Sequence, residues 1–367
     1  MKEKRILYVQ DKFGLGGINR ITSVKENYFV SHQYEVHNFC CLDEGSILSK
    51  ERYDKRIIFH TIRKQKLDEL YNIPLVGRLC RYLYFRIKFL IILYRINPDI
   101  IIVTQPFLEP LLVVVMSFWK KRILEFHGWY NGKDISHIKI KERIISRYKL
   151  KFYNVVSLSK REAEHVYNIT KNHSLYIHNP LYKKPIRMSN CDSKKVVVLS
   201  RLSSEKNLLD LVFVWKSIEI KHPDWSLHIY GDGVEKKKIL DGIKQNGLLT
   251  MYLHSYIMDP FSVLLDSSIY VLTSAHEGFP LVLVEAMSIG VPCVAYDCPY
   301  GPSEIIKDGE DGFLVKTMNP IEMIQKVNLL IEDEDLRKRM GKYAAVNVKR
   351  FDINKIMGQW VSLFDSL

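Results

Sequence analysis

Two glutamates lie eight positions apart in the stretch SAHEGFPLVLVEAMSIGVP, which covers residues 274–292. Pro280 suits the first turn of a helix, because its φ angle is fixed and it has no N–H group to leave without a partner. A helix is expected from Pro280 to Ile289, with Glu277 just before it and Glu285 one turn inside it. Because backbone N–H groups at a helix start bind phosphate, the stretch predicts an anion site between two carboxylates.

The anion that this site suits is a diphosphate joined to a ribose. A carboxylate can accept two hydrogen bonds at once, so the vicinal hydroxyls of a ribose would satisfy Glu285 inside its apolar helix. Glu277 would bind a second polyol. A site for a diphosphate, a ribose and a second polyol fits a nucleotide sugar. The alternative is that Glu285 pairs with a buried lysine or arginine. The amides expected at the anion site are those of Gly278, Phe279, Leu281 and Val282.

Two cations and a glycine-rich turn extend the predicted site. Arg201 follows a strand in VVVLSRLSSEKN, and Lys206 lies at the start of the next helix. Both cations can face the same cleft and neutralise a leaving diphosphate. Gly231 opens the turn GDG after the strand SLHIY, where a glycine can admit a base or a phosphate.

The elements that position these residues alternate between strand and helix. This order predicts parallel, doubly wound sheets. The rhythm breaks in a polar stretch at 167–195 and then restarts, so we expect two α/β halves with a cleft between them. The expected strands lie at 5–9, 99–103, 122–126, 154–159, 195–200, 226–230, 268–273 and 292–297.

Together the motifs resemble the retaining glycosyltransferases of family 4, which have the GT-B fold. The resemblance is dense over residues 195–317, which include SRLSSEKN, IYGDG, SAHEGFPLVLVEAMSIGVPCVA and GPSEIIKDGEDGFLV. It is thinner in the first half, where GLGGINR and FHGWY match. It implies an acceptor-binding Rossmann-like domain at 1–180 and a nucleotide-sugar-binding Rossmann-like domain at 181–349. A C-terminal helix at 350–367 would pack back on the first domain.

The resemblance also implies a role for each matching residue. Glu277 and Glu285 match the E-x7-E motif of the family, and would contact the donor sugar and the ribose. Arg201 and Lys206 would bind the diphosphate and stabilise it as it leaves. His127 would lie beside the anomeric carbon, or else is a strand-end histidine with satisfied hydrogen bonds. The donor-binding residues are completed by Gly16, Gly17, Gly231, Tyr256, Gly278, Phe279, Pro280 and Leu281.

The sequence departs from the family pattern at two places. Asn19 stands where the family often has Glu, and Ser255 stands where it often has Gly before the base-binding loop. The second departure leaves two interpretations of Tyr256, which either stacks on the base or belongs to the core. A metal-dependent transferase would need an Asp-x-Asp pair at a strand end. Since EDED at 332–335 reads as surface charge, we expect no metal ion and no other cofactor besides the nucleotide-sugar donor, a UDP-sugar by family frequency.

The charge of the chain is uneven. The formal net charge is +13, and residues 1–180 hold 31 Lys and Arg against 17 Asp and Glu. A basic helix at 77–99 either packs on the core with a solvated basic face or lies on an anionic membrane. We expect a glycan, lipid-linked or teichoic-acid-type acceptor and contact with the inner face of the membrane. The six cysteines show no disulfide or metal-ligand pattern, which favours the cytoplasm.

Three other classes of protein are alternatives for this sequence. An NAD-dependent oxidoreductase would need G-x-G-x-x-G, and GLGGIN, which starts at Gly14, does not have that spacing. A nucleic-acid-binding protein would explain the charge but not the E-x7-E motif, and no nucleic-acid-binding motif is present. A non-catalytic relative that only binds nucleotide sugars fits the same motifs and stays open as the alternative.

Overall fold

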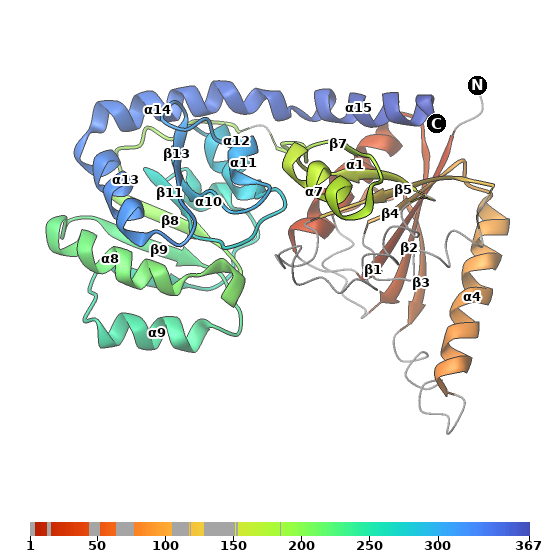
Figure 1. Ribbon diagram of the computed structural model, residues 1–367, viewed down its shortest axis with the longest axis horizontal. Coiled ribbons are helices and arrows are strands. Elements are labelled where there is room, and N and C mark those ends of the chain that lie inside the picture. Colours follow the sequence, from red (N-terminus) through yellow and green to blue (C-terminus); the bar gives the residue numbers. More distant parts are fainter. Residues whose placement is uncertain are drawn as a thin grey trace.

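The computed structural model consists of two parallel-sheet domains that form separate lobes (Figure 1). Both sheets have helices on their faces, so the predicted doubly wound α/β class is confirmed. The structure describes residues 4–12, 16–43, 52–63, 77–104, 117, 119–127, 151, 153–183 and 185–367.

The first domain is built on a seven-stranded sheet with the order β3-β2-β1-β4-β5-β6-β7. All the recorded strand pairs of this sheet are parallel. Its strands are β1 (Arg5–Lys12), β2 (Glu35–Asp43), β3 (Ile58–Arg63), β4 (Ile100–Val103), β5 (Lys121–Glu125), β6 (Asn154–Ser157) and β7 (Ser174–Tyr176). Its described helices are α1 (Gly17–Ser31), α4 (Gly77–Ile96) and α7 (Lys160–Thr170).

The second domain is built on a six-stranded parallel sheet with the order β10-β9-β8-β11-β12-β13. Its strands are β8 (Lys195–Leu199), β9 (Ser226–Tyr230), β10 (Met251–His254), β11 (Ile269–Leu272), β12 (Cys293–Tyr296) and β13 (Gly312–Val315). Its helices are α8 (Leu209–Lys221), α9 (Lys236–Gln245), α10 (Phe261–Leu264), α11 (Leu281–Ser288), α12 (Pro302–Ile305), α13 (Pro320–Glu332) and α14 (Glu334–Asn347), with the 3₁₀ turns η3 (Ser204–Lys206) and η4 (Val348–Phe351).

The central strands are apolar runs because both of their faces are buried. In β4 and β11 every residue is buried, which is typical of parallel strands covered by helices on both sides. Each sheet therefore has two apolar clusters, one on each face. Most of the predicted site residues lie in the loops that follow the carboxyl ends of the strands, or at the starts of the helices after those loops.

The last helix of the chain, α15 (Ile353–Ser366), crosses from the second domain to the first (Figure 1). Its apolar side chains Met357, Trp360 and Phe364 are fully buried against β1, β2 and α1. Phe364 lies 5.1 Å from Phe29 of α1, measured between ring centroids. The C-terminal helix thus contributes to the core of the first domain, although it follows the second domain in the sequence.

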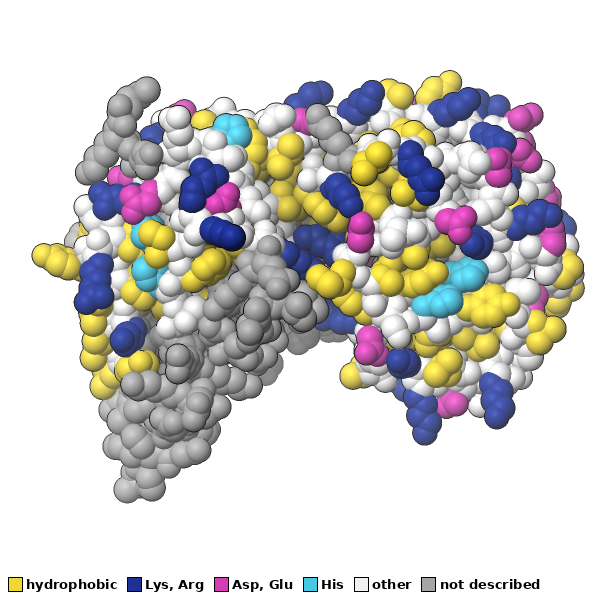
Figure 2. Space-filling model, turned by 180° about the vertical axis from the view of Figure 1, so that it is seen from behind, with side chains coloured by type: hydrophobic (Ala, Val, Ile, Leu, Met, Phe, Trp, Pro, Cys, Tyr) yellow, Lys and Arg dark blue, Asp and Glu magenta, His cyan; other side chains and the backbone are white. Residues whose placement is uncertain are grey.

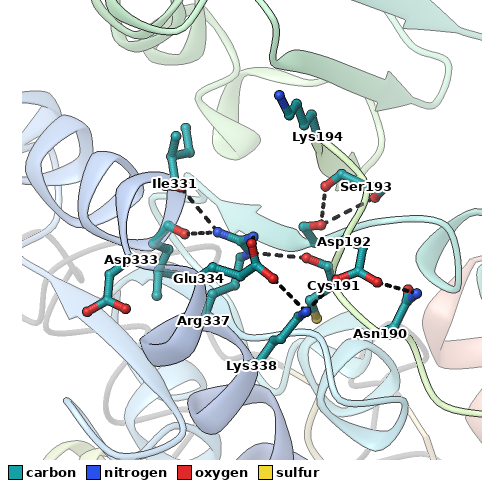
Figure 3. A network of polar contacts seen from close by, with 12 residues as sticks. Asn190, Cys191, Asp192, Ser193, Lys194, Ile331, Asp333, Glu334, Arg337 and Lys338 are labelled. Atoms are coloured by element: carbon teal, nitrogen blue, oxygen red, sulfur yellow. Dashed lines mark hydrogen bonds and ion pairs between the residues drawn. The ribbon is translucent and has the colours of Figure 1, made fainter.

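The connection between the domains is fastened to the second domain by Arg337 of α14 (Figure 3). The buried guanidinium donates to the carbonyl oxygen of Cys191 at 3.1 Å and to those of Leu330 and Ile331 at 2.6 and 3.2 Å. It also lies over the ring of Trp225. Because each buried carbonyl would otherwise lack a partner, this one side chain holds the connecting segment against the end of α13.

Helix α4 stands at the outer edge of the first domain. Phe89, Leu93 and Ile96 face the core, whereas the opposite face exposes apolar side chains, with Ile87 at 55% and Tyr94 at 90%. Figure 2 shows apolar side chains together with Lys and Arg along this edge. In the described part of the chain no helix is both long enough and apolar enough to span a membrane.

Candidate functional site

The predicted site helix is present as α11, which is one residue shorter at each end than expected. Pro280 is its N-cap residue and Ile289 its C-cap residue, and Gly290 follows with a φ of +79°. A side chain at position 290 would be strained in this left-handed conformation, so glycine ends the helix as predicted. The helix start lies after β11, at the carboxyl edge of the second sheet.

Glu277 and Lys206 are brought into direct contact, although they are far apart in the sequence. Lys206 Nζ lies 2.6 Å from Glu277 Oε1, and Ser274 Oγ donates to the same oxygen at 2.6 Å. The side chains of Lys206 and Glu277 are 19% and 13% exposed. A lysine and a carboxylate thus lie side by side near the start of α11, where a phosphate and a sugar hydroxyl would each find a charged partner.

Backbone contacts hold the two loops that carry this pair. Ala275 donates its N–H to the carbonyl oxygen of Glu205 at 2.9 Å, and Thr273 Oγ1 donates to the carbonyl oxygen of Lys206 at 3.0 Å. The loops after β8 and β11 are therefore joined on both sides of the ion pair. The two charges are fixed by main-chain structure rather than by the pair alone.

Arg201 is placed differently from Lys206. Its side chain is 71% exposed, and its guanidinium pairs with Glu205 at 2.8 Å. Within the described ranges no recorded contact joins it to Lys206 or Glu277. The sequence predicts both cations at the diphosphate, but the structure brings only Lys206 to the carboxylate.

Gly278, Phe279 and Pro280 form the tight turn before α11. The ring of Phe279 faces the core, stacked on His178 with centroids 5.3 Å apart and in edge contact with Phe351. Gly301 packs so closely beneath Pro280 that a Cβ atom there would collide with the proline ring. It is therefore the backbone of this turn, and not the phenyl ring of Phe279, that is in position to bind a ligand.

The glycines of the GDG turn have a packing reason. A Cβ atom at Gly231 would collide with the carbonyl oxygen of Ser200, and one at Gly233 would collide with that of Leu202. Gly233 also has a φ of +153°. The loops after β8 and β9 pack backbone against backbone, which accounts for both glycines without a ligand.

The start of α1 meets the start of α11 across the domain boundary. Gly16 is the N-cap residue of α1, and Gly17 is its first residue. A Cβ atom at Gly17 would lie 3.8 Å from Leu281 Cδ1, whereas no described atom lies within 4 Å of the corresponding point at Gly16. Two helix N-termini, each with a partial positive charge, therefore converge where a diphosphate is predicted.

Glu285 has a partner that the sequence left open as an alternative. Its side chain is 3% exposed, and its Oε1 lies 3.1 Å from Nη1 of Arg20, a residue of α1 in the other domain. Burial raises the pKa of Glu285, while Arg20 and the hydroxyl of Tyr182 act against that shift. Arg20 was not predicted as a site residue. Its one signal in the sequence is its position, three residues after the pair Gly16 and Gly17.

Tyr256 lies in the loop after β10 and is 44% exposed. Its hydroxyl interacts with Arg20, and Arg20 Nη2 also donates to the carbonyl oxygen of Met258 at 3.3 Å. Tyr256 is therefore near Glu285 and not buried in the core.

His127 lies at the end of β5 and belongs to a buried charged cluster. Its Nε2 is 3.4 Å from Glu125 Oε1, and Nζ of Lys25 in α1 bonds to the same carboxylate oxygen. Burial alone would raise the pKa of Glu125, but Lys25 and His127 together lower it below its ordinary value. Among the described contacts none joins His127 to Glu277 or Lys206. Lys25 and Glu125 hold His127 in place. Neither of them was predicted from the sequence as a site residue.

With this geometry established, comparisons with known proteins define the class. Residues 183–346 match a family model described as glycosyl transferases group 1. A poly(ribitol-phosphate) alpha-N-acetylglucosaminyltransferase of Staphylococcus aureus is 28% identical over 67% of this chain and 51% of its own length. The amylovoran biosynthesis glycosyltransferase AmsD of Erwinia amylovora is 34% identical over 45% of this chain and 46% of its own. The chain spans about half the length of the curated relatives it matches.

The fold is similar over its whole length to solved structures. Anabaena HepE, in complex with UDP and glucose, has a TM-score of 0.81 at 19% identity, and the match covers 100% of both chains. The fold is therefore GT-B, as the sequence predicts. Together with the family match, it supports a glycosyltransferase as the class of enzyme.

Proposed function

We propose that the protein is a retaining glycosyltransferase that moves a hexosyl or N-acetylhexosaminyl group from a UDP-sugar to an acceptor hydroxyl. The observation that carries this proposal is the contact between Lys206 and Glu277 beside the start of α11. A cation, a carboxylate and the amides at a helix start suit a diphosphate and a sugar at adjacent positions. The start of α1, at Gly16 and Gly17, faces this group from the other domain.

Each side chain has a distinct part in the proposed reaction. The acceptor oxygen attacks the anomeric carbon on the face that the diphosphate leaves, the bond to the phosphate oxygen breaks, and the departing phosphate oxygen takes the proton of the acceptor hydroxyl. Lys206, Arg201 and the amides of the turn before α11 stabilise the negative charge of the leaving group. Glu277 holds the donor sugar, Glu285 holds the ribose, and His127 orients the reacting groups. In this scheme the diphosphate needs no metal ion.

The proposed acceptor is a polysaccharide, a lipid-linked oligosaccharide or a teichoic-acid-type polymer. The relative from Staphylococcus aureus acts on poly(ribitol phosphate), and the one from Erwinia amylovora serves amylovoran biosynthesis. An anionic polymer matches the basic balance of residues 1–180. We place the protein in the cytoplasm, at the inner face of the cell membrane.

The direct test is to incubate the purified protein with UDP-GlcNAc, UDP-glucose and UDP-galactose, with poly(ribitol phosphate) or lipid-linked glycans as acceptors. We expect UDP release that depends on the acceptor, and an α-linked product from an α-linked donor sugar. Activity should persist in excess EDTA. Binding of UDP without transfer to any acceptor would favour the alternative, a non-catalytic nucleotide-sugar-binding relative. Loss of activity in EDTA would contradict the metal-independent scheme.

The exposed face of α4 is the proposed membrane contact. It combines apolar side chains such as Leu83, Ile87 and Tyr94 with the exposed cations Lys88 and Arg95. Apolar area together with positive charge binds anionic lipid surfaces.

We expect the protein to sediment with vesicles that contain phosphatidylglycerol, and much less with pure phosphatidylcholine. The double variant Ile87→Glu/Tyr94→Glu should lose this binding, because it places acids against an anionic surface. The matched control Ile220→Glu changes an apolar residue of the second domain that is 78% exposed, and should sediment like the parent protein. Equal sedimentation of all three proteins would contradict a membrane role for α4.

A further inference from the structure

Arg20 belongs to the first domain, but its side chain contacts residues of the second domain. It lies in the first turns of α1, and its side chain is 17% exposed. Its Nη1 contacts Glu285 Oε1 at 3.1 Å, and its Nη2 donates to the carbonyl oxygen of Met258 at 3.3 Å. One guanidinium thus joins α1 to α11 and to the loop after β10.

The carboxylate of Glu285 depends on this arginine. Burial favours the protonated form of a carboxylic acid, and a nearby cation favours the ionised form. Glu285 is almost fully buried, and burial raises its pKa, whereas the charge of Arg20 lowers it. Only an ionised carboxylate accepts hydrogen bonds on both oxygens without donating one, which is what the two hydroxyls of a ribose require.

Tyr182 occupies the position beside this pair. Its hydroxyl bonds to Glu285 and accepts from Arg20 Nη1 at 3.3 Å, and the guanidinium carbon lies 5.6 Å from the centre of its ring. Burial and the neighbouring Glu285 raise the pKa of Tyr182, so that it stays a neutral hydroxyl. A ribose hydroxyl is the same kind of donor. It can replace the tyrosine hydroxyl at the carboxylate without disturbing the ion pair.

We propose that Arg20 is a positioning residue for ribose recognition, which holds the carboxylate of Glu285 toward the ribose. Before the donor binds, the Tyr182 hydroxyl occupies the position at this carboxylate that a ribose hydroxyl then takes. This inference rests on the proposed function, because it assigns Glu285 to the ribose of the donor. It adds that recognition needs both domains, since α1 supplies the cation. Because Arg20 also contacts Met258, the loop that carries Tyr256 is coupled to ribose recognition.

The test compares two nucleotides on Arg20→Gln by titration calorimetry. We expect UDP to bind about tenfold or more weakly than it binds the parent protein, because a charge-assisted contact is lost. 2′,3′-Dideoxyuridine diphosphate has no hydroxyl for Glu285, so its affinity should change less than about threefold. Arg20→Lys keeps the charge and should recover part of the UDP affinity. Arg20→Lys also serves as the test protein if Arg20→Gln does not fold, as judged by thermal unfolding.

Arg161→Gln is the matched control. Arg161 of α7 is another arginine that crosses the domain boundary, with Nη1 3.0 Å from Asp297 Oδ1, but no described contact links it to Glu285. Its loss should leave the affinity for both nucleotides within about twofold of the parent. Tyr182→Phe should bind UDP more tightly, since no hydroxyl has to be displaced.

Other results would overturn the inference. An equal loss for both nucleotides in Arg20→Gln would mean that Arg20 acts on the diphosphate or on the fold. Tighter UDP binding in Arg20→Gln would mean that Arg20 competes with the ribose. Weaker UDP binding in Tyr182→Phe would make Tyr182 itself a nucleotide ligand. A parent protein that binds neither nucleotide would refute the proposed function, and this inference with it, before any variant is compared.

Discussion

Replacing Lys206 by methionine should lower kcat for sugar transfer by about 10²–10³-fold, the cost of removing one group that stabilises developing negative charge in an active site. Methionine keeps the unbranched shape and most of the length of the side chain and removes the ammonium, which lies 2.6 Å from Glu277 Oε1. The charge on the diphosphate grows as the sugar leaves, so the cation matters more in the transition state than in the ground state. Steady-state kinetics with the natural donor measures the effect.

Lys221→Met is the control for this variant. Lys221 is an exposed lysine of the same domain that pairs with Glu332, and its replacement should leave kcat unchanged. The expected pattern for Lys206→Met is a fall in kcat with a smaller change in the affinity for UDP. If KM rises while kcat is preserved, Lys206 binds the donor without stabilising its departure, and the proposed role is wrong.

The local features of the site could be predicted from the sequence. The α11 boundaries were within one residue, because Pro280 and Gly290 act through backbone geometry that depends on their own identity. The fold class could be predicted for a similar reason, since buried parallel strands leave continuous runs of β-branched residues such as those of β4.

The partners of the site residues could not be predicted in this way. Arg20 lies 265 positions from Glu285, and Lys25 lies 100 positions from Glu125. Each pair forms only because two domains, or a helix and a distant strand, come together in the fold. The sequence did contain a weak signal, since Glu125 directly follows the apolar residues Ile123 and Leu124 and lies two residues before His127.

Helix α1 carries the cation of both ion pairs. Its Arg20 reaches the second domain at Glu285, and its Lys25 reaches the carboxylate that contacts His127. Lys25 also lies over Trp360 of α15, with the nitrogen 4.8 Å from the ring centre. Helix α1 therefore contacts the second domain through Arg20, and the cluster around His127 and the C-terminal helix through Lys25.

Replacing Lys25 by methionine should destabilise the protein by about 3–5 kcal/mol at pH 7, because it leaves a buried carboxylate without its cation. Lys25 and Glu125 are 0% and 1% exposed, so water does not replace the lost partner. Denaturant unfolding followed by circular dichroism gives the free energy. The double variant Lys25→Met/Glu125→Leu should recover most of the loss, since it removes both charges and keeps apolar volume.

The pH dependence separates this explanation from simple loss of packing on Trp360. In the parent protein Lys25 and His127 hold the pKa of Glu125 below its ordinary value despite burial, so its contribution to stability is present above that value and is lost as the pH falls through the folded-state pKa. Without Lys25, burial is expected to raise the pKa of Glu125, and stability is then lost as the pH rises. The gap between the parent and Lys25→Met should therefore widen from about pH 4 to pH 7. A gap that is the same at every pH, or a double variant as unstable as Lys25→Met, would show that Lys25 acts through its contact with Trp360 and not through its charge.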